Sequence, residues 1–597
     1  MRFKSKVTDG YQVFAVSGTN TVSFAVDAAA ADTKDLLGFA VERFDPQANE
    51  RYFMPGFKVF RSVIPAPDET TTVSTNEHPI QSFVWDDFTA KPKHKYEYAF
   101  QPLHGQPKNL DRSRRRVVIA VKTEPAFSDL AHDVFFNRGV ASSQAYERRF
   151  GNKAPDQQDT PQKEKEALQW LSRDLDEALL KFIKNAKKND TLLGCFYEFR
   201  YLPVAQELKK ALNRGVKVRL VIDAKENAKK DKNGVLQPPF PREANLETLK
   251  KAKIPLKTVT FLREARAANI QHNKFLVLLK GKTEKPAEVW TGSTNISMGG
   301  VHGQTNVGHW VRDEDTAAAF LGYWNLLKTD PGAVKGDDKS TTLAKNKAYR
   351  TAVEQLDQVP TTLDKIPDGI TAIFSPRGGG KVLEMYAALV DKAEELSCIT
   401  LAFGISDVFK AQISDNTKQD HLAFFLLEKR DKPNPKSKKE FVALNAKNNV
   451  YKAWGSFLRN PLHQWAKETS ARALGLNTHV SFIHSKFLLR DPLGLDPIVV
   501  TGSANFSKAS TNDNDENMII IRGDQRVADI YFTEFNRLFF HYYFRSVQEA
   551  TFKPGVTPKP GSAGDLFLSE NDDWLGKYKP GSLRQKRVDV LARMKGV

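Results

Sequence analysis

A duplicated motif constrains this chain more than any other feature of its sequence. Residues 270–274 read Ile-Gln-His-Asn-Lys and residues 482–486 read Phe-Ile-His-Ser-Lys, so each segment places a His and a Lys two positions apart at the head of an apolar run. Because side chains alternate along a β-strand, the imidazole and the ammonium leave the same face. The motif therefore predicts two strands, each with both groups on one face.

The similarity continues downstream of each motif. Gly-Ser-Thr-Asn at 292–295 follows the first segment, and Gly-Ser-Ala-Asn at 502–505 follows the second. Asn295 lies 23 positions beyond His272, and Asn505 lies 21 positions beyond His484. One turn in the intervening hairpin absorbs this difference. The sequence therefore contains a duplicated unit.

The first 125 residues have a different pattern, with short alternating apolar runs separated by turn residues. Six such runs occur, at 11–16, 37–41, 57–60, 82–85, 96–100 and 117–121. Strands at this spacing predict an all-β sandwich over residues 1–125. The aromatic residues Trp85, Tyr96 and Tyr98 make this region resemble a fibronectin type III-like domain.

Strands and helices alternate after this region. Residues 126–162 read as a linker, and 163–335 as the first α/β half, beginning with an amphipathic helix over 164–188. The expected order then runs strand 192–199, helix 203–212, strand 216–222 and a helix near 244–251. This alternation predicts a parallel or mixed sheet with helices on both faces.

The second half repeats this order over residues 369–550. Its expected elements are strand 372–374, helix 382–395, strand 398–403 and a strand within 422–427. Each half ends with an aromatic-rich helix after an apolar strand, at 315–327 and at 528–543. Residues 336–368 read as a crossover linker with a short helix, and 551–597 as a C-terminal tail that wraps the surface.

The repeated residues are groups that handle phosphate. Lysine supplies positive charge, serine and asparagine supply hydrogen-bond donors, and histidine attacks phosphorus or transfers protons. Two sets related by pseudo-twofold symmetry place one imidazole on each side of a phosphodiester. We therefore expect one shared pocket that contains His272, Lys274, Asn295, His484, Lys486 and Asn505.

The duplicated His-x-Lys and Gly-Ser-x-Asn pattern over residues 164–550 resembles the phospholipase D superfamily. The resemblance implies an α/β fold with two pseudo-symmetric α/β/α halves that share one active site. It also implies a two-step transfer through a phosphohistidine with no metal or other cofactor. The second copy has the whole pattern, including Asp491, Asn514 and Glu516; the first copy has Leu279 and Asn306 in place of Asp491 and Glu516.

The resemblance also implies roles for the site residues. The acidic residue of one half serves the histidine of the other, so Glu516 pairs with His272 and Asn306 is left for His484. His272 is then the nucleophile and His484 the general acid, because a carboxylate stabilises the positive charge of a phosphohistidine. The catalytic set is His272, Lys274, Asn295, His484, Lys486, Asn505 and Glu516; Ser293, Ser503 and Asn306 complete it as substrate-binding residues.

Net charge bears on the substrate. The 89 basic and 71 acidic residues give +18 at pH 7, which favours a polyanion such as DNA or RNA. Basic clusters occur at 112–116, 229–232, 429–439 and 584–587. Two cysteines in apolar runs exclude a disulfide scaffold, and no apolar run reaches 18 residues, so we expect a cytoplasmic protein without membrane insertion.

Three readings of the function follow. The first is a nuclease that cleaves nucleic-acid phosphodiester bonds. The second is a phospholipase D or phosphatidyl transferase that acts on acidic or other phospholipids, which requires exposed aromatic or apolar residues beside the site. The third is a nucleic-acid-binding scaffold in which the asymmetric first half is impaired. The sequence does not specify the oligomeric state.

Overall fold

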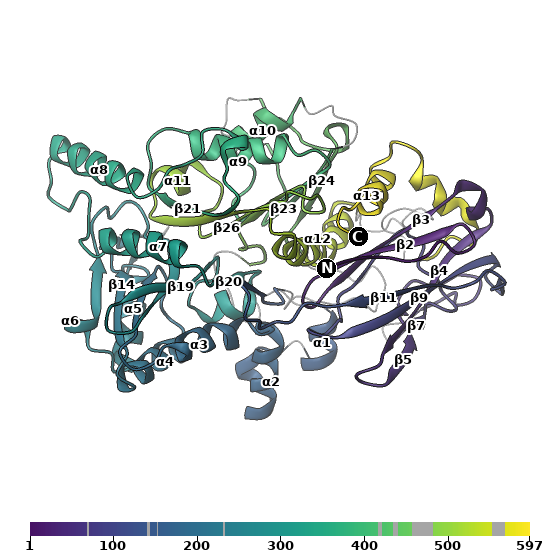
Figure 1. Ribbon diagram of the computed structural model, residues 1–597, viewed down its shortest axis with the longest axis horizontal. Coiled ribbons are helices and arrows are strands. Elements are labelled where there is room, and N and C mark those ends of the chain that lie inside the picture. The colour runs from purple at the N-terminus through teal and green to yellow at the C-terminus, as the bar shows by residue number, and fades with distance from the viewer. Residues whose placement is uncertain are drawn as a thin grey trace.

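The computed structural model describes residues 1–67, 71–139, 144–151, 153–230, 233–415, 421–433, 440–456, 481–551 and 567–597. A β-sandwich forms one end of the molecule, and two α/β halves form the other (Figure 1). The long helix α12 (Gln525–Thr551) lies between the second half and the sandwich. The architecture is the predicted one, with an all-β region before two α/β halves.

The sandwich consists of two antiparallel sheets. The first has the order β1-β2-β3-β8, and the second has the order β10-β9-β4-β5, with β11 also paired to β9. Their bounds are β1 Arg2–Lys4, β2 Tyr11–Ser17, β3 Val22–Ala28, β4 Leu36–Asp45, β5 Glu50–Phe53, β8 Val84–Asp87, β9 Lys95–Gln106, β10 Asn109–Asp111 and β11 Val117–Lys122. A small hairpin joins β6 (Pro55–Gly56) to β7 (Val73–Ser74). Alternate residues of β11 are buried, as expected for a strand with one face in the core.

The first α/β half is built on a sheet of seven strands in the order β12-β20-β19-β18-β13-β14-β17. The strands are β12 His132–Phe136, β13 Thr191–Phe196, β14 Lys217–Asp223, β17 Thr260–Arg263, β18 Lys274–Lys280, β19 Lys285–Gly292 and β20 Val307–Val311. Strands β13, β14 and β17 are parallel, and β18 is antiparallel to β13. The sheet is therefore mixed, as predicted.

Helices cover both faces of this sheet. On β18, Phe275 and Val277 join one apolar core and Leu276 and Leu278 join another, because successive side chains leave opposite faces. The helices of this half are α3 Leu175–Asn185, α4 Leu202–Asn213, α5 Arg242–Lys251, α6 Leu256–Val259 and α7 Glu314–Leu327. A short hairpin, β15 (Lys229–Lys230) with β16 (Leu236–Gln237), lies outside the sheet.

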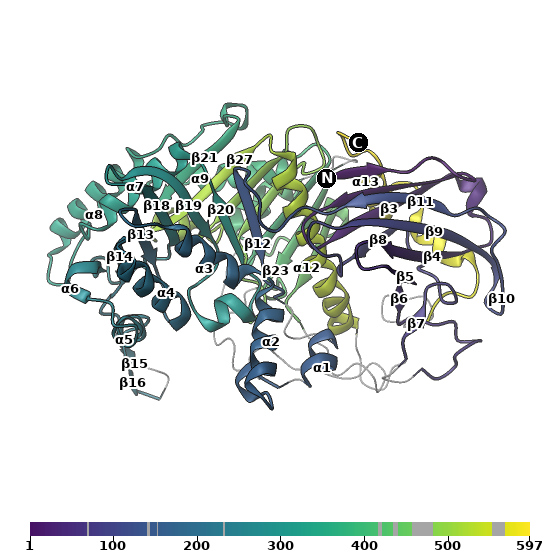
Figure 2. The ribbon, with the colours of Figure 1, turned by 60° about the horizontal axis from the view of Figure 1, so that its bottom comes forward.

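The second half repeats this strand order. Its seven strands run β21-β27-β26-β25-β22-β23-β24, which corresponds position by position to the first sheet. The strands are β21 Gly369–Ser375, β22 Leu396–Leu401, β23 Leu422–Leu427, β24 Val450–Trp454, β25 Phe487–Arg490, β26 Ile498–Gly502 and β27 Glu516–Arg522. Helices α9 (Lys381–Asp391), α10 (Asp407–Ile413) and α11 (Lys508–Asn512) accompany them. Figure 2 shows β18–β20 of the first sheet below β21 and β27 of the second.

The predicted linkers contain regular structure. Within 126–162, β12 pairs with β20 at the edge of the first sheet, and α1 (Gln144–Phe150) follows it. Helix α8 (Lys339–Glu354) occupies the crossover. In the C-terminal tail, α13 (Leu583–Ala592) packs near β3, and Trp574 Nε1 donates to the Leu36 carbonyl at 2.8 Å. Residues 152, 434–439 and 552–566, which the linker, basic-cluster and tail predictions include, lie outside the described residues.

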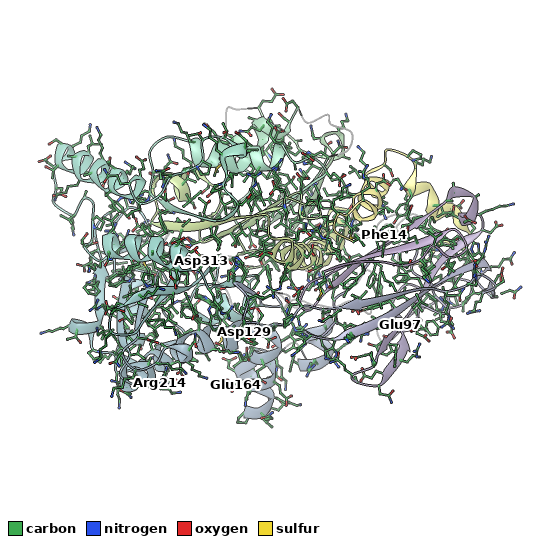
Figure 3. All side chains as sticks on the ribbon, in the orientation of Figure 1. Phe14, Glu97, Asp129, Glu164, Arg214 and Asp313 are labelled. Atoms are coloured by element: carbon green, nitrogen blue, oxygen red, sulfur yellow. The ribbon has the colours of Figure 1, made fainter. Side chains whose placement is uncertain are left out.

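Two predicted elements differ in the structure. The expected helix 164–188 is divided into α2 (Pro161–Ser172) and α3, because Arg173 and Asp174 adopt positive φ angles of 45° and 71°. This break lets the buried Arg173 guanidinium reach Glu534 of α12 at 2.6 Å. The expected strand at 57–60 forms a single bridge, between Val59 and Phe567, in place of a ladder. Figure 3 shows side chains filling the space between the two halves and along their contact with the sandwich.

Candidate active site

The two His-x-Lys motifs meet where the halves face each other. His272 and His484 precede the central strands β18 and β25, and their ring centroids lie 6.3 Å apart. Bridges between the halves hold the backbones in place: Gln271 pairs with Asp515, and Thr305 pairs with Ile483. Both imidazoles are about 5% exposed. The two histidines therefore share one buried site, although 212 positions separate them in the sequence.

Each histidine is hydrogen-bonded to the opposite half. His272 Nδ1 lies 2.9 Å from Glu516 Oε2, and His484 Nδ1 lies 2.9 Å from Asn306 Oδ1. Ser503 Oγ donates to Glu516 at 2.6 Å, and Ser293 Oγ donates to Asn306 Oδ1 at 2.8 Å. Ser293 and Ser503, predicted with Asn306 as substrate-binding residues, use their hydroxyl protons to hold the histidine partners Asn306 and Glu516.

Hydrogen bonds around Asn306 determine the tautomer of His484. Asn306 Nδ2 donates to the Gly300 carbonyl at 2.8 Å, so Oδ1 is the atom that faces the imidazole. An amide oxygen is an acceptor, so His484 Nδ1 carries the proton. Both ring contacts use Nδ1, and Nε2 is therefore the nitrogen of each ring that is left for chemistry.

The motif glycines allow a close approach between strands. Gly292 and Gly502 have φ angles of 133° and 156°, and a Cβ at either position would lie 2.3 Å from a carbonyl oxygen, that of Val307 or Asn517. Glycine avoids this clash because it has no side chain. The next residue of each motif, Ser293 or Ser503, is thereby brought beside the following strand.

The motif lysines lie beneath the histidines. Lys274 Nζ donates to the His272 carbonyl, and Lys486 Nζ donates to the His484 carbonyl at 2.5 Å. Burial lowers the pKa of Lys274 to about 7 and that of Lys486 well below its usual value. Burial, followed by the two nearby ammonium groups, also lowers the pKa of both imidazoles well below 6.5. Glu516 shifts in the opposite direction, because burial raises its pKa to about 8.

The two motif asparagines have different surroundings. Asn295 Nδ2 donates to Glu198 Oε1 at 3.2 Å, whereas no hydrogen bond of the Asn505 side chain is found among the described residues. The Oδ1 atoms of both asparagines are buried and unpaired within that part of the chain. Sequence reasoning missed Glu198. Its position two residues beyond β13, at the sheet edge that carries His272, is the one signal that could have found it.

Asp515, the neighbour of Glu516, is surrounded by buried donors. Arg263 Nε contacts its carboxylate at 2.8 Å, Arg266 Nη1 at 3.2 Å and Tyr349 Oη at 2.9 Å. Its backbone carbonyl accepts the His272 N–H at 2.8 Å. This cluster therefore holds Glu516 and His272 in register across the interface between the halves.

Leu279 and Asp491, the positions at which the two motifs differ, lie away from the histidines. Asp491 accepts hydrogen bonds from the backbone N–H groups of residues 394–396, just before β22. In the first half Asp190, just before β13, performs a similar function, since its Oδ1 accepts the Gly281 N–H at 2.8 Å. A carboxylate therefore joins the corresponding strand ends in both halves.

In the described ranges, no group of three or more His, Cys, Asp or Glu side chains is arranged to hold a metal ion. Among the helices of the described chain, none has the length and apolar character needed to cross a bilayer.

Comparison with known proteins was made at the level of sequence and of fold. Residues 179–325 and 433–539 match the family described as cardiolipin synthase, PLD-like domain. No curated protein matches the chain. Among solved structures, Haemophilus influenzae phosphatidylserine synthase aligns at 12% identity and a TM-score of 0.43, over 70% of this chain and 93% of that one.

Two further structures have lower scores. The Salmonella typhimurium phospholipase D family member Nuc aligns at 22% identity and a TM-score of 0.20, over 26% of this chain and 87% of that one. Yeast tyrosyl-DNA phosphodiesterase aligns at 11% identity and a TM-score of 0.29, over 58% and 86% of the two chains. The family match lies within the α/β halves and includes both copies of the motif, and these halves are therefore PLD-like domains.

Proposed function

We propose that this protein is a phosphodiesterase that works through a covalent phosphohistidine on His272, without a metal ion. One observation carries the proposal: the two facing imidazoles have different partners, a carboxyl group on His272 and a carboxamide on His484. A carboxylate stabilises the positive charge that a histidine gains when it attacks phosphorus. A carboxamide gives no such charge stabilisation, which suits a histidine that transfers a proton.

In the first step, His272 Nε2 attacks the phosphorus of a diester. The negative charge of the bound diester favours the protonated form of His484. The bond from phosphorus to the leaving oxygen breaks, and His484 gives its Nε2 proton to that oxygen. The second step reverses these roles. A water molecule loses a proton to His484 and attacks the phosphorus, and the P–N bond breaks to restore neutral His272.

The remaining motif residues stabilise the phosphoryl oxygens. Lys274 and Lys486 supply positive charge from each half, and Asn295 and Asn505 add amide donors. These groups are buried beside the two histidines, where low polarity strengthens their effect. Ser293 and Ser503 act indirectly by holding Asn306 and Glu516.

The lysines predict how activity depends on pH. Lys274, whose pKa is about 7, gains its charge as the pH falls through that value, whereas His272 stays neutral because its pKa is lower still. Glu516, whose pKa is about 8, loses its negative charge as the pH falls through the same range. We therefore expect kcat/KM for bis(p-nitrophenyl) phosphate in EDTA to be highest near pH 7 to 8, to fall at higher pH as Lys274 loses its charge, and to fall at lower pH as Glu516 gains a proton. Lys274→Arg should weaken the fall at higher pH, because a guanidinium stays charged. A profile that is flat from pH 6 to 9 would contradict the assignment.

Nucleic acid is the substrate that we favour, and the net charge of +18 supports it. In the structure, some residues of the basic clusters already have partners within the protein and are therefore less available to nucleic acid. In cluster 112–116, Arg115 pairs with Asp9 and Arg116 with Glu42, and in cluster 584–587 the Arg587 guanidinium lies over the Phe540 ring. Lys229 and Lys230 of β15 are exposed, and residues 231–232 and 434–439 of the other clusters lie outside the described residues.

Binding to nucleic acid should depend strongly on salt. If six to ten phosphates are contacted, affinity of the inactive His272→Ala variant for single-stranded DNA should fall by roughly 10³-fold or more between 50 and 200 mM salt. Fluorescence anisotropy at several salt concentrations measures this slope. Affinity that stays constant over this range would reject the nucleic-acid assignment.

A phospholipid is the second candidate, and exposed apolar side chains favour it. Phe403, just beyond β22, is 70% exposed, and Met298, three residues beyond Asn295, is 43% exposed. Such side chains beside a catalytic edge are suited to contact lipid. Assays in EDTA with labelled DNA, RNA and phosphatidylcholine vesicles separate the two classes, because each substrate releases a different product.

A further inference from the structure

The two walls of the pocket differ in chemistry at equivalent positions. In the first half, Phe196 of β13 pairs with Lys274, so Glu198 lies across from His272. In the second half, Ile399 of β22 pairs with Leu488, and the same register continued places Phe403 across from His484. Glu198 is 8% exposed, whereas Phe403 is 70% exposed. The pseudo-symmetry of the motif therefore does not extend to these walls.

Glu198 links Asn295 to the partly exposed Arg200. Its Oε1 accepts from Asn295 Nδ2 at 3.2 Å, and its Oε2 accepts from Arg200 Nη2 at 2.6 Å and from Arg200 Nε at 3.2 Å. Both carboxylate oxygens are thus occupied. Glu198 is therefore a positioning residue for Asn295 and Arg200, with no free oxygen for substrate.

Arg200 is held rigidly and yet remains accessible. Its guanidinium lies 5.3 Å from the centre of the Phe240 ring, and Phe240 contacts Tyr197, whose ring lies 5.3 Å from that of His272. Its backbone N–H donates to the Ile296 carbonyl at 2.7 Å, which also fixes the residue. The side chain is 39% exposed, and Nη1 has no hydrogen bond to any described residue. Arg200 is thus connected to His272 through Phe240 and Tyr197, and to Asn295 through Glu198.

We propose that Arg200 is a specificity-determining residue that binds a second anionic group of the substrate, the phosphate next to the scissile one in a nucleic-acid strand. A guanidinium provides paired, planar donors that suit phosphate oxygens, and one that is already oriented loses less entropy on binding. The ion pair with Glu198 is open to solvent on the Arg200 side, where pairing contributes little stability, so stability alone does not account for Arg200. This inference rests on the proposed function and specifies which substrate the site prefers, namely one with a second anionic group.

The test compares substrates that differ by one phosphate. In the first pair, thymidine 5′-(p-nitrophenyl phosphate) carries only the scissile diester, and its 3′-phosphorylated analogue adds the neighbouring anion. In the second pair, thymidine 3′-(p-nitrophenyl phosphate) is used with and without a 5′-phosphate, which tests the other strand direction. We expect the wild type to prefer the doubly phosphorylated member of one pair. Arg200→Gln should lower kcat/KM for that member by roughly 10- to 100-fold, mainly through KM, and change the other by less than about twofold.

Three further variants make the result specific. Glu198→Gln should lower kcat for both members, because Asn295 serves the scissile phosphate, and should also reduce the preference, because the same carboxylate orients Arg200. Arg200→Lys should restore part of the preference, since it keeps the charge. The control is Arg214→Gln, which removes the charge of an arginine that pairs with Glu207 and is also partly exposed. Arg214 lies at the outer end of the first half (Figure 3), so this variant should leave the preference unchanged.

Two outcomes overturn the inference. If Arg200→Gln lowers kcat/KM equally for both members of each pair, its role is structural; if the wild type cleaves all four substrates without preference, no second anion is read. A wild type that cleaves none of them would instead reject the proposed function. A separate experiment compares vesicles of phosphatidylserine with vesicles of phosphatidylcholine. If Arg200→Gln loses activity only on phosphatidylserine vesicles, the second anion belongs to a lipid head group, and the nucleic-acid form of the proposal is overturned.

Discussion

Replacing His484 with alanine is expected to leave a protein that forms a covalent adduct and cannot hydrolyse it. With bis(p-nitrophenyl) phosphate the leaving phenolate needs no proton, so attack by His272 proceeds without the general acid. Hydrolysis of the adduct needs His484 to activate water, and it should slow by about 10²- to 10⁴-fold. We expect a burst of one p-nitrophenolate per protein and an intact mass increased by one phosphoryl ester.

His272→Ala should behave differently. Removal of a covalent nucleophile reduces kcat by up to about 10⁶-fold, and we expect neither a burst nor an adduct. His94→Ala, a change of another histidine that lies in the sandwich beside Asp45, serves as the matched control and should retain full activity. An adduct mapped to His484 in the wild type would reverse the assigned roles, and adduct formation by His272→Ala would refute them.

The second large effect concerns stability and the buried carboxylate of Asp515. Burial opposes its ionisation, but Arg263, Lys225 and Arg266 hold its pKa below the usual value. Asp515→Ala leaves the Arg263 and Arg266 guanidinium groups buried without this partner. We expect the free energy of unfolding to fall by about 3–5 kcal/mol, the usual result of breaking a buried ion pair from one side. Urea denaturation measures it.

The matched control is another Asp→Ala change in an exposed ion pair. Asp368 is 91% exposed and lies 3.6 Å from Arg522, so its removal should change stability by less than about 0.5 kcal/mol. If Asp515→Ala does not fold, Asp515→Asn, which preserves the shape of the side chain, supplies the comparison. A loss below about 1 kcal/mol in both Asp515 variants would show that the cluster does not stabilise the contact between the halves.

Most of the catalytic set could be predicted from the sequence because its signals are local. The His-x-Lys and Gly-Ser-x-Asn segments recur as short strings. The predicted strands begin later than expected, since His272, His484 and Lys486 precede β18 and β25, but each motif still lies at the start of a central strand. The pairing of Glu516 with His272 and of Asn306 with His484 was implied by a family resemblance, and the structure contains both contacts. Their chemical roles remain predictions.

The tertiary structure decided everything that depends on register and packing between distant segments. Glu198 and Arg200 belong to no repeated string, and their place at the pocket follows from the pairing of β13 with β18. Strand β12 lies in a sequence that reads as a linker, because its partner β20 is far away in the chain: Val134 pairs with His309, 175 positions later. The break between α2 and α3 depends on Glu534, a residue in another half. Local periodicity reports which face of a segment is apolar, but a single segment cannot specify which distant segment covers that face, and this choice determined the walls of the site.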